Sequence, residues 1–322
     1  MSNLKLECQA LRTGIGFCDL SGRTQIELTG ADRAKVLHGL CTNDIKRLTP
    51  GGGCEAFLTN VQGKTTGFIN VFCQEASLVV DTSPGLAQEI IPALDRYIIR
   101  EDVTLIDRSQ EWGEVLVSGT QAIDLLATQF VGSLPDSRVA ISTGTIDTHP
   151  IQVRRMPYTS PECFLLCCEA SRIPDIMAWL IRNDAVACGC DAIDVSRIEM
   201  GVPVFGLDLT ADNLPQEIAR DEFAISFTKG CYLGQETVAR LDALGHVNRR
   251  LLGLKFSGTA VPPPGTIISV AGKQVAQVTS SCFSPRMGSP LALAFVRRGS
   301  DKPGMTFQSE FGEAEVVTLP LQ

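Results

Sequence analysis

The sequence has 322 residues, of which 44% are apolar and 20% charged, and its formal net charge is −8. This composition excludes a disordered chain, and the acidic balance argues against direct binding to nucleic acid, which would need a basic patch. No apolar run approaches the ~18 residues of a membrane span, and the first residues lack the apolar core of a secretory signal. We therefore expect no membrane partner. The twelve cysteines in so long a chain predict a reducing, cytoplasmic location.

The first third of the chain alternates strand-like and helical patterns. Residues 23–30 predict a strand, and residues 30–42 a helix with Asp32 in its first turn. Residues 51–72 predict two strands around a polar turn. Residues 85–102 have a helical period that Pro92 should start, kink or break.

The alternation continues to about residue 246 and then stops. Strands are predicted at 103–109 and 112–119, and the segment Cys163–Cys168 reads as a strand that is apolar on both faces, as in a buried strand. Helices are predicted at 120–134 and 173–184. From about residue 247 only short β-rich runs and turns remain. The mixed order indicates an α+β fold followed by a small β-barrel or sandwich of about 75 residues.

Several segments resemble known motifs but lack residues that those motifs require. Gly63–Gly67 resembles a phosphate loop, but Leu58 stands where its first glycine is required. Cys188 and Cys190 lack the additional cysteines or histidines that would complete a metal site, so we expect no metal. His38 and His149 are more simply structural residues than ligands or bases.

The segment Phe227–Arg240, "FTKGCYLGQETVAR", carries the strongest chemical signal. Cys231 precedes a predicted helix whose free N–H groups favour an anion, and Lys229 adds positive charge, so both would favour the thiolate. Gly230 and Gly234 would allow a left-handed turn or close approach to a flat ligand. The alternative is that the glycines serve the turn and the cysteine fills a gap. His246 is a weak candidate for a base.

The same segment resembles the signature K-G-C-[FY]-x-G-Q-E of the YgfZ family, folate-binding proteins related to the glycine cleavage T-protein (aminomethyltransferase). Similar stretches occur along essentially the whole chain, including "FLTNVQGKTTG" and "SRIEMGVPVFGLDL". The resemblance implies two interleaved ferredoxin-like halves around a folate cavity and a C-terminal barrel. The expected regions are residues 1–142, 143–246 with the Lys-Gly-Cys motif, and 247–322.

By this resemblance, the protein would bind tetrahydrofolate and support the assembly or repair of iron–sulfur enzymes, including enzymes that modify tRNA. Its partners would be folate and those client or assembly proteins. The family's functional residues map onto Lys229, Cys231 (the candidate functional thiol), Gln235 and Glu236. Arg197 maps onto an arginine near the folate's glutamate tail, and a guanidinium suits that carboxylate. The alternative for Arg197 is an ion pair on a helix surface with Asp194 or Glu199.

One departure bears on catalysis. Where T-proteins have an acid pair beside the folate nitrogen that receives the one-carbon unit, this chain has Gly67 and Phe68, and Leu165 replaces the glutamate that would hold the pterin. Loss of a positioned acid removes about 10²–10⁴-fold of acid–base help. The sequence therefore favours a folate-binding accessory protein, with a true aminomethyltransferase as the alternative and a binding module that uses the old pocket only as a scaffold as a third.

Overall fold

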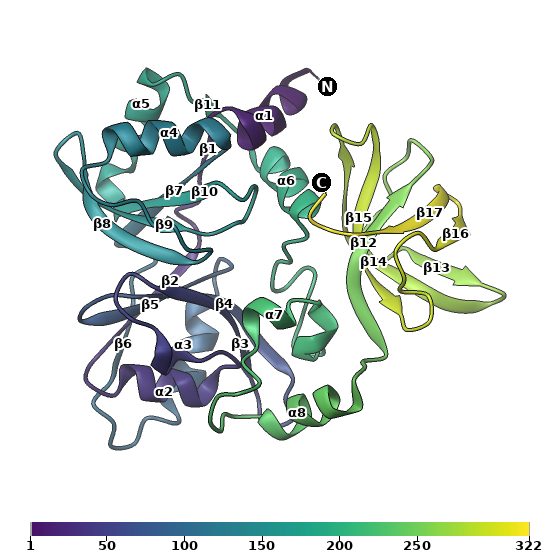
Figure 1. The fold of residues 1–322 in the computed structure, drawn as a ribbon, viewed down its shortest axis with the longest axis horizontal. Helices are drawn as coiled ribbons and strands as arrows, with labels where there is room; N and C mark the ends of the chain where they lie inside the picture. The colour runs from purple at the N-terminus through teal and green to yellow at the C-terminus, as the bar shows by residue number, and fades with distance from the viewer. Residues whose placement is uncertain (1, 322) are drawn as a thin grey trace.

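The computed structural model describes residues 2–321, which form three β-sheets with helices packed on them. Two sheets lie on one side of the molecule and the third on the other, and the C-terminus returns to lie beside the helix Cys190–Met200 (Figure 1). Within this described part, no helix combines the length and apolarity that a membrane crossing requires.

The first sheet is antiparallel and has the strand order β3-β4-β5-β2-β6. Its strands are β2 (Thr24–Thr29), β3 (Gly53–Thr59), β4 (Thr65–Cys73), β5 (Ser77–Thr82) and β6 (Thr104–Asp107). Helices α2 (Arg33–Leu40) and α3 (Ala87–Asp95) share an apolar core with the sheet because Leu37 and Ile90 pack with Ile26. The predicted helix after Asp32 and the predicted pair of strands are confirmed. Pro92 lies inside α3, which ends at Asp95, earlier than predicted.

The second sheet has the order β11-β1-β7-β10-β9-β8. Its elements are β1 (Gly16–Asp19), β7 (Trp112–Ser118), β8 (Ala140–Ile146), β9 (His149–Arg155), β10 (Cys163–Glu169), β11 (Val186–Ala187), and the helices α1 (Ser2–Thr13), α4 (Thr120–Gln129), α5 (Ile173–Arg182) and α6 (Cys190–Met200). Strand β10 is buried on both faces, as predicted: Phe164 packs in one core and Leu165 in another.

The first two regions expected from the sequence share strands, in keeping with the interleaved halves that the resemblance implies. The boundary placed at residue 142 falls inside β8, and β1, from the beginning of the chain, pairs with β7 and β11 in the second sheet. Hydrogen bonding between strands from distant parts of the chain therefore overrides the order of the sequence.

The third sheet, β13-β14-β15-β12-β17-β16, confirms the β-rich C-terminal region. Its strands are β12 (Arg249–Phe256), β13 (Ile267–Val270), β14 (Lys273–Ser284), β15 (Ser289–Arg297), β16 (Thr306–Ser309) and β17 (Gly312–Val317). The edge strands β13 and β16 lie next to each other, so the sheet nearly closes into a barrel around a core that includes Leu254 and Val278.

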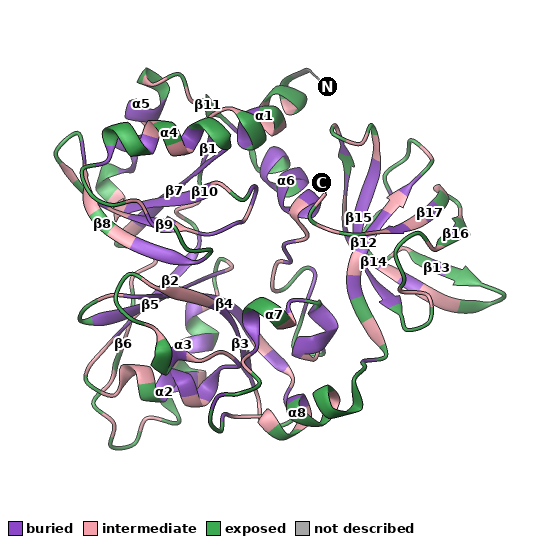
Figure 2. Cartoon of the chain, viewed as in Figure 1, coloured by how far each residue is buried: buried purple, intermediate pink, exposed green. Residues whose placement is uncertain are grey.

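A connecting segment joins α6 to the barrel and lies between the sheets (Figure 1). It contains η3 (Pro215–Ile218), α7 (Asp221–Ala224) and α8 (Gln235–Leu244); two further short helices elsewhere are η1 (Ile45–Arg47) and η2 (Ala170–Arg172). Figure 2 shows that α8 is largely exposed, with Val238 as its buried residue.

Candidate functional site

The Phe227–Gly234 loop connects α7 to α8 and lies against the end of α2. Helix α8 begins at Gln235 with Glu236 in its first turn, as predicted, and Gly234 before it has the positive φ of +79°. The backbone N–H of Leu233 donates to the carbonyl of Gly39 at 2.9 Å. The loop is therefore fixed to the first sheet's helix and does not form a free flap.

Gly234 allows the Phe227–Gly234 loop to pack closely against the turn between β3 and β4. A Cβ atom on Gly234 would lie 2.3 Å from the carbonyl oxygen of Asn60, and one on Gly63 would lie 2.9 Å from the carbonyl oxygen of Gly234. Real Cβ atoms do not approach so closely, and both residues have positive φ. Gly234 thus serves backbone packing against the β3–β4 turn, which is the structural alternative that the sequence left open.

Lys229 is buried, and its ammonium group is directed toward the segment 38–43. It donates to the carbonyl oxygens of His38 at 2.5 Å, Cys41 at 2.7 Å and Asn43 at 2.8 Å. An ammonium has three N–H donors, so all of them are used. Lys229 acts as a structural tie in this geometry, which leaves no proton for a folate.

The other motif residues lie at the surface. Cys231 and Glu236 are exposed and Gln235 is half-buried, and none of them hydrogen-bonds through its side chain within residues 2–321. A central cavity lies between the first sheet, the segment after β9 and the connector from α6 to α7. Neither these residues nor Lys229 line it. The structure brings the four motif residues together in one turn but does not bring them to that cavity.

The central cavity is narrow in this structure, with an accessible volume of about 20 Å³, which is room for about one water molecule. Its walls come from the first sheet, from the segment after β9 and from the connector between α6 and α7. It is lined by Arg23, Glu55, Phe68, Asn70, Ser83, Met156, Pro157, Tyr158, Val202, Pro203, Val204 and Arg220. Two aromatic rings, one carboxylate and several polar groups thus face one narrow space between these elements.

Glu55 is the acid among these lining residues. Arg220 donates to both of its carboxylate oxygens at 2.6 Å, and Arg138 donates a third hydrogen bond at 3.0 Å. Burial opposes the ionisation of Glu55, but Arg220 and Arg138 outweigh it and hold the pKa of this carboxyl below its ordinary value. Glu55 is therefore a fixed carboxylate that can accept N–H donors and is a poor proton donor.

Two other polar groups of the cavity have no protein partner. Asn70, opposite Glu55 in the β3–β4 pairing, is 8% exposed, and its amide makes no hydrogen bond among the described residues. The same holds for the hydroxyl of half-buried Tyr158, whose pKa is raised by burial, so that it remains a donor at neutral pH. Neither group is among the fully buried polar atoms that lack a partner, so water reaches both, and a ligand could replace that water.

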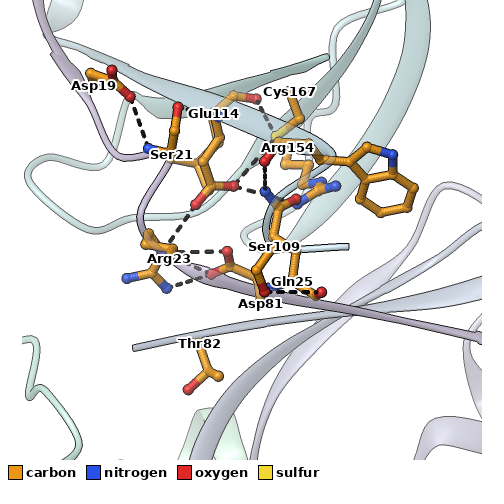
Figure 3. Close-up of polar contacts among 12 residues, drawn as sticks. Asp19, Ser21, Arg23, Gln25, Asp81, Thr82, Ser109, Glu114, Arg154 and Cys167 are labelled. Carbon is orange, nitrogen blue, oxygen red and sulfur yellow. Dashed lines mark hydrogen bonds and ion pairs between the residues drawn. The ribbon is translucent and has the colours of Figure 1, made fainter. Parts of the chain in front are cut away.

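A buried charge network supports Arg23 in the cavity wall (Figure 3). Its guanidinium donates to Asp81, and its Nε atom lies 3.2 Å from Glu114 Oε1. On the other side, Arg154 lies 3.5 Å from Glu114 Oε2 and donates to Gln25 at 2.8 Å. Burial, reinforced by repulsion from Asp81, raises the pKa of Glu114 to about 8. The network fixes Arg23 in place.

The positions where T-proteins have acids face different environments. A Cβ atom on Gly67 would point at Leu58 of the apolar core at 3.3 Å, whereas Phe68 lines the cavity and lies 5.1 Å, centroid to centroid, from Phe57. Leu165 is fully buried in β10. An acid at position 68 would therefore reach the cavity, and an acid at position 67 would not.

Arg197 is 1% exposed and is not a surface residue. Its Nε atom donates to Asp194 at 2.6 Å, and its Nη1 atom donates to Asp208 at 2.9 Å and to the carbonyl of Val202 at 3.3 Å. The alternative of an ion pair with Asp194 is thus present: Asp194 is exposed, whereas Asp208, which accepts from the same guanidinium, is buried. Arg197 supports the wall that contains Val202, and its predicted contact with a glutamate tail stays a prediction.

His246 does not lie near Cys231. The two residues flank α8, whose ten residues span about 15 Å, and the exposed His246 ring contacts the carbonyl of Leu244 at 2.8 Å. The hypothesis that His246 is a base for the thiol is therefore wrong for this structure, because a rigid helix separates the two.

Cys188 and Cys190 have different environments. Cys188 is buried, and burial raises its thiol pKa to about 12, whereas Cys190 is exposed. No group of three or more possible metal ligands occurs within residues 2–321. The structure therefore offers this pair no third ligand.

Sequence reasoning missed the residues that line the cavity, above all Glu55, Asn70, Tyr158 and Arg220. They come from three distant segments, and no local spacing connects them. The available signal was a polar residue within an apolar strand: Glu55 and Asn70 both interrupt such runs.

The described geometry agrees with comparisons to known proteins. The family model described as "GCVT N-terminal domain" matches residues 1–229, and that described as "Glycine cleavage T-protein C-terminal barrel domain" matches residues 249–321. The chain belongs to the GCVT family. Aminomethyltransferases of the GCVT family use tetrahydrofolate.

Relatives and a solved structure support this assignment. An aminomethyltransferase of Rippkaea orientalis is 28% identical over 96% of this chain and 85% of its own length. A putative chloroplastic transferase of Arabidopsis thaliana, At1g60990, is 27% identical over 92% of this chain and 68% of its own. The glycine cleavage system aminomethyltransferase T of Bartonella henselae has the same fold, with a TM-score of 0.83 over 98% of this chain and 89% of its own at 20% identity. The predicted T-protein-like fold is confirmed, while membership of the YgfZ family in particular stays a prediction.

Proposed function

We propose that this protein binds tetrahydrofolate in the central cavity. The observation that carries the proposal is that Asn70 and Tyr158 present polar groups without protein partners beside the fixed carboxylate of Glu55. Use of tetrahydrofolate in the GCVT family supports the same ligand.

The lining residues fit the chemistry of a pterin. Phe68 offers an aromatic face for a flat ring. Glu55 Oε2 accepts one hydrogen bond from Arg220 and can accept another from a ring N–H group, whereas Oε1 already accepts two. Asn70 can both donate and accept, and the Tyr158 hydroxyl can do the same. When bound, the folate would supply the nitrogen atoms that carry a one-carbon unit, and these residues would orient it and exclude water.

The comparisons favour aminomethyl transfer over an accessory role, because curated relatives that match nearly the whole chain are named aminomethyltransferases. The side chains that line the cavity, however, indicate that such a reaction would be slow. Glu55 is held as a carboxylate by Arg220, and position 68, which faces the cavity, is a phenylalanine. We infer that any transfer is slower than in relatives with the acid pair by about 10²–10⁴-fold.

The second candidate function is support of iron–sulfur enzymes, including enzymes that modify tRNA. One observation favours it: Cys231, the functional thiol implied by the resemblance, is exposed at the surface and can be reached by a partner protein. Loss of this support in a Cys231→Ala variant that still binds tetrahydrofolate would favour it, and full complementation would count against a role for the thiol.

Calorimetry with tetrahydrofolate tests the binding proposal. We expect saturable binding that weakens about tenfold in Asn70→Ala and in Tyr158→Phe, since each variant removes a hydrogen-bonding group without breaking a contact within the protein. Arg240→Ala, on the exposed face of α8, is the matched control and should bind like the wild type. Absence of saturable binding, or equal affinity in all four proteins, would contradict the proposal.

A turnover assay with an aminomethyl donor distinguishes the two candidates. Multiple turnovers would establish a transferase. If they are absent, Phe68→Asp, which places an acid at the cavity-facing position, should raise the rate of transfer if the missing acid is the obstacle. No turnover in either protein, with tetrahydrofolate binding intact, would leave the accessory role.

A further inference from the structure

A cleft separate from the central cavity lies between helix α8 and the C-terminal barrel. It has a volume of about 480 Å³, within the range of about 300–1,000 Å³ that small-molecule sites occupy. Its walls come from η3 and α7, from the end of α8, from the start of β12 and from the turn after β15, with apolar surface from Leu241 and Val247. Within residues 2–321 it shares no lining residue with the central cavity, so it is a second, independent candidate site.

Two buried acceptor atoms belong to residues that line this cleft and have no hydrogen-bond partner among the described residues. They are Gln216 Oε1 and Asp221 Oδ1. Gln216 is 5% exposed, and its Nε2 atom donates to the carbonyl of Val238 at 2.7 Å, so the amide is held with its oxygen unpaired. The other carboxylate oxygen of Asp221 accepts from Arg250 at 3.3 Å. Buried acceptors normally have a partner, so this wall of the cleft lacks an N–H donor.

A second carboxylate adds negative charge on the same side. Asp242 belongs to α8, lines the cleft and is exposed. Burial raises the pKa of Asp221, and the charge of Asp242 adds to this rise, which Arg250 only partly offsets. An ammonium group that entered the cleft would stabilise both carboxylates. A metal ion suits the cleft less well, because no group of three or more possible metal ligands occurs within residues 2–321.

The barrel contributes cations that have no protein partner. Arg298 and Lys302 follow β15 and are exposed, and their side chains form no ion pair or hydrogen bond in the described part of the chain. Asp301, between them, instead accepts from the backbone N–H of Gly299 at 2.9 Å. Beside one imidazole, the cleft is lined by three carboxylates and three cations: Asp221, Asp242, Asp301, Arg250, Arg298 and Lys302. These charges balance, which favours a ligand that carries both signs.

We propose that this cleft binds a small zwitterion with one ammonium and one carboxylate group, that is, an amino acid with an apolar side chain. The ammonium group donates to Gln216 and Asp221, the acceptors that the protein leaves unpaired. The carboxylate accepts from Arg298 and Lys302, whose charges are otherwise unpaired. The apolar side chain lies against the apolar part of the lining. The proposal does not depend on tetrahydrofolate binding, because the two sites have different walls.

Titration of the full-length protein with L-leucine, without folate, tests the site. The amide NMR signals of Gly245 and Gly299, which both line the cleft, report binding there, and we expect saturable shifts. Isoamylamine is leucine without the carboxylate, and isocaproate is leucine without the ammonium group. Each should bind at least about tenfold more weakly, because each loses charge-assisted hydrogen bonds. Absence of saturable shifts up to about 10 mM L-leucine, or equal affinity for the three molecules, would overturn the proposal.

Variants assign the two ends of the ligand. Arg298→Gln should weaken the binding of L-leucine about tenfold and leave that of isoamylamine unchanged, whereas Asp221→Asn should weaken both. Arg297→Gln and Glu222→Gln are the matched controls, because both residues are exposed neighbours that do not line the cleft, and both variants should bind like the wild type. Unchanged affinity for L-leucine in folded Arg298→Gln and Asp221→Asn would overturn the proposal. If Asp221→Asn does not fold, the exposed Arg298→Gln decides alone.

Discussion

The central cavity and the Phe227–Gly234 loop use their polar groups in opposite ways. In the loop, all three N–H groups of the Lys229 ammonium donate to protein carbonyls, and Gly234 allows the loop to pack against the β3–β4 turn. In the cavity, Asn70 and Tyr158 keep their polar groups free beside Glu55. The comparison shows that the most recognisable motif of the sequence marks a tied surface turn, whereas the groups available to a ligand lie elsewhere.

The strongest test of the loop's structural character is Lys229→Met. This variant removes the donor of the His38 and Cys41 carbonyl groups, while the Asn43 carbonyl still accepts from Ile45 N–H, so we expect the free energy of unfolding to fall by about 3 kcal/mol. Urea denaturation at neutral pH measures it. Lys64→Met is the control, because exposed Lys64 only contacts Asp212 at 3.5 Å and should cost less than about 0.5 kcal/mol. Equal effects would remove the distinction between loop and cavity.

Gly234→Ala tests how closely the loop packs against the β3–β4 turn. The new Cβ atom would meet the carbonyl oxygen of Asn60 in a backbone with positive φ, so we expect a loss of about 2 kcal/mol or more. Gly245 also has positive φ but has open space around it, and Gly245→Ala should cost about 1 kcal/mol. Thermal unfolding of both variants measures the difference; equal values would mean that the contact with Asn60 does not matter.

The network behind the cavity predicts a pH dependence of stability. The pKa of Glu114 is about 8 in the folded protein and 4.5 in a free side chain, so the folded state holds a proton that the unfolded state has lost between those values. Stability should therefore fall as pH rises from about 5 to about 8. In Glu114→Gln this decline should be smaller by at least about 1 kcal/mol, while exposed Glu169→Gln should behave like the wild type. An identical slope in all three proteins would contradict the assigned charge state.

The smallest expected effect is that of Cys231→Ser on folate affinity. The thiol does not line the cavity, so the dissociation constant for tetrahydrofolate should change less than about twofold. Calorimetry measures it beside Asn70→Ala. A larger loss in Cys231→Ser than in Asn70→Ala would reverse the roles of the two regions.

Local patterns predicted the elements well. Contacts between neighbours in the sequence shape these elements, so their spacing could be read directly. This holds for the helical period of residues 30–42, the polar turn at 60–64 and the apolar run of β10. The start of α8 after Gly234 could be predicted for the same reason. Pro92 lies inside α3 and does not end the helix there.

The candidate site was predictable only in part. Cys231 was readable from its motif, but the direction of the Lys229 ammonium depends on carbonyl groups about 190 residues away. The pairing of Glu55 with Arg220 likewise joins distant segments. A single sequence holds no spacing that records such contacts, so Glu55 was overlooked.

A crystal structure of the tetrahydrofolate complex tests the central claim most directly. The account predicts that the pterin ring lies against Phe68, with its N–H groups toward Glu55 and Asn70, and that no folate atom contacts Cys231. A pterin ring seated against the Cys231 thiol, or outside the central cavity, would contradict it.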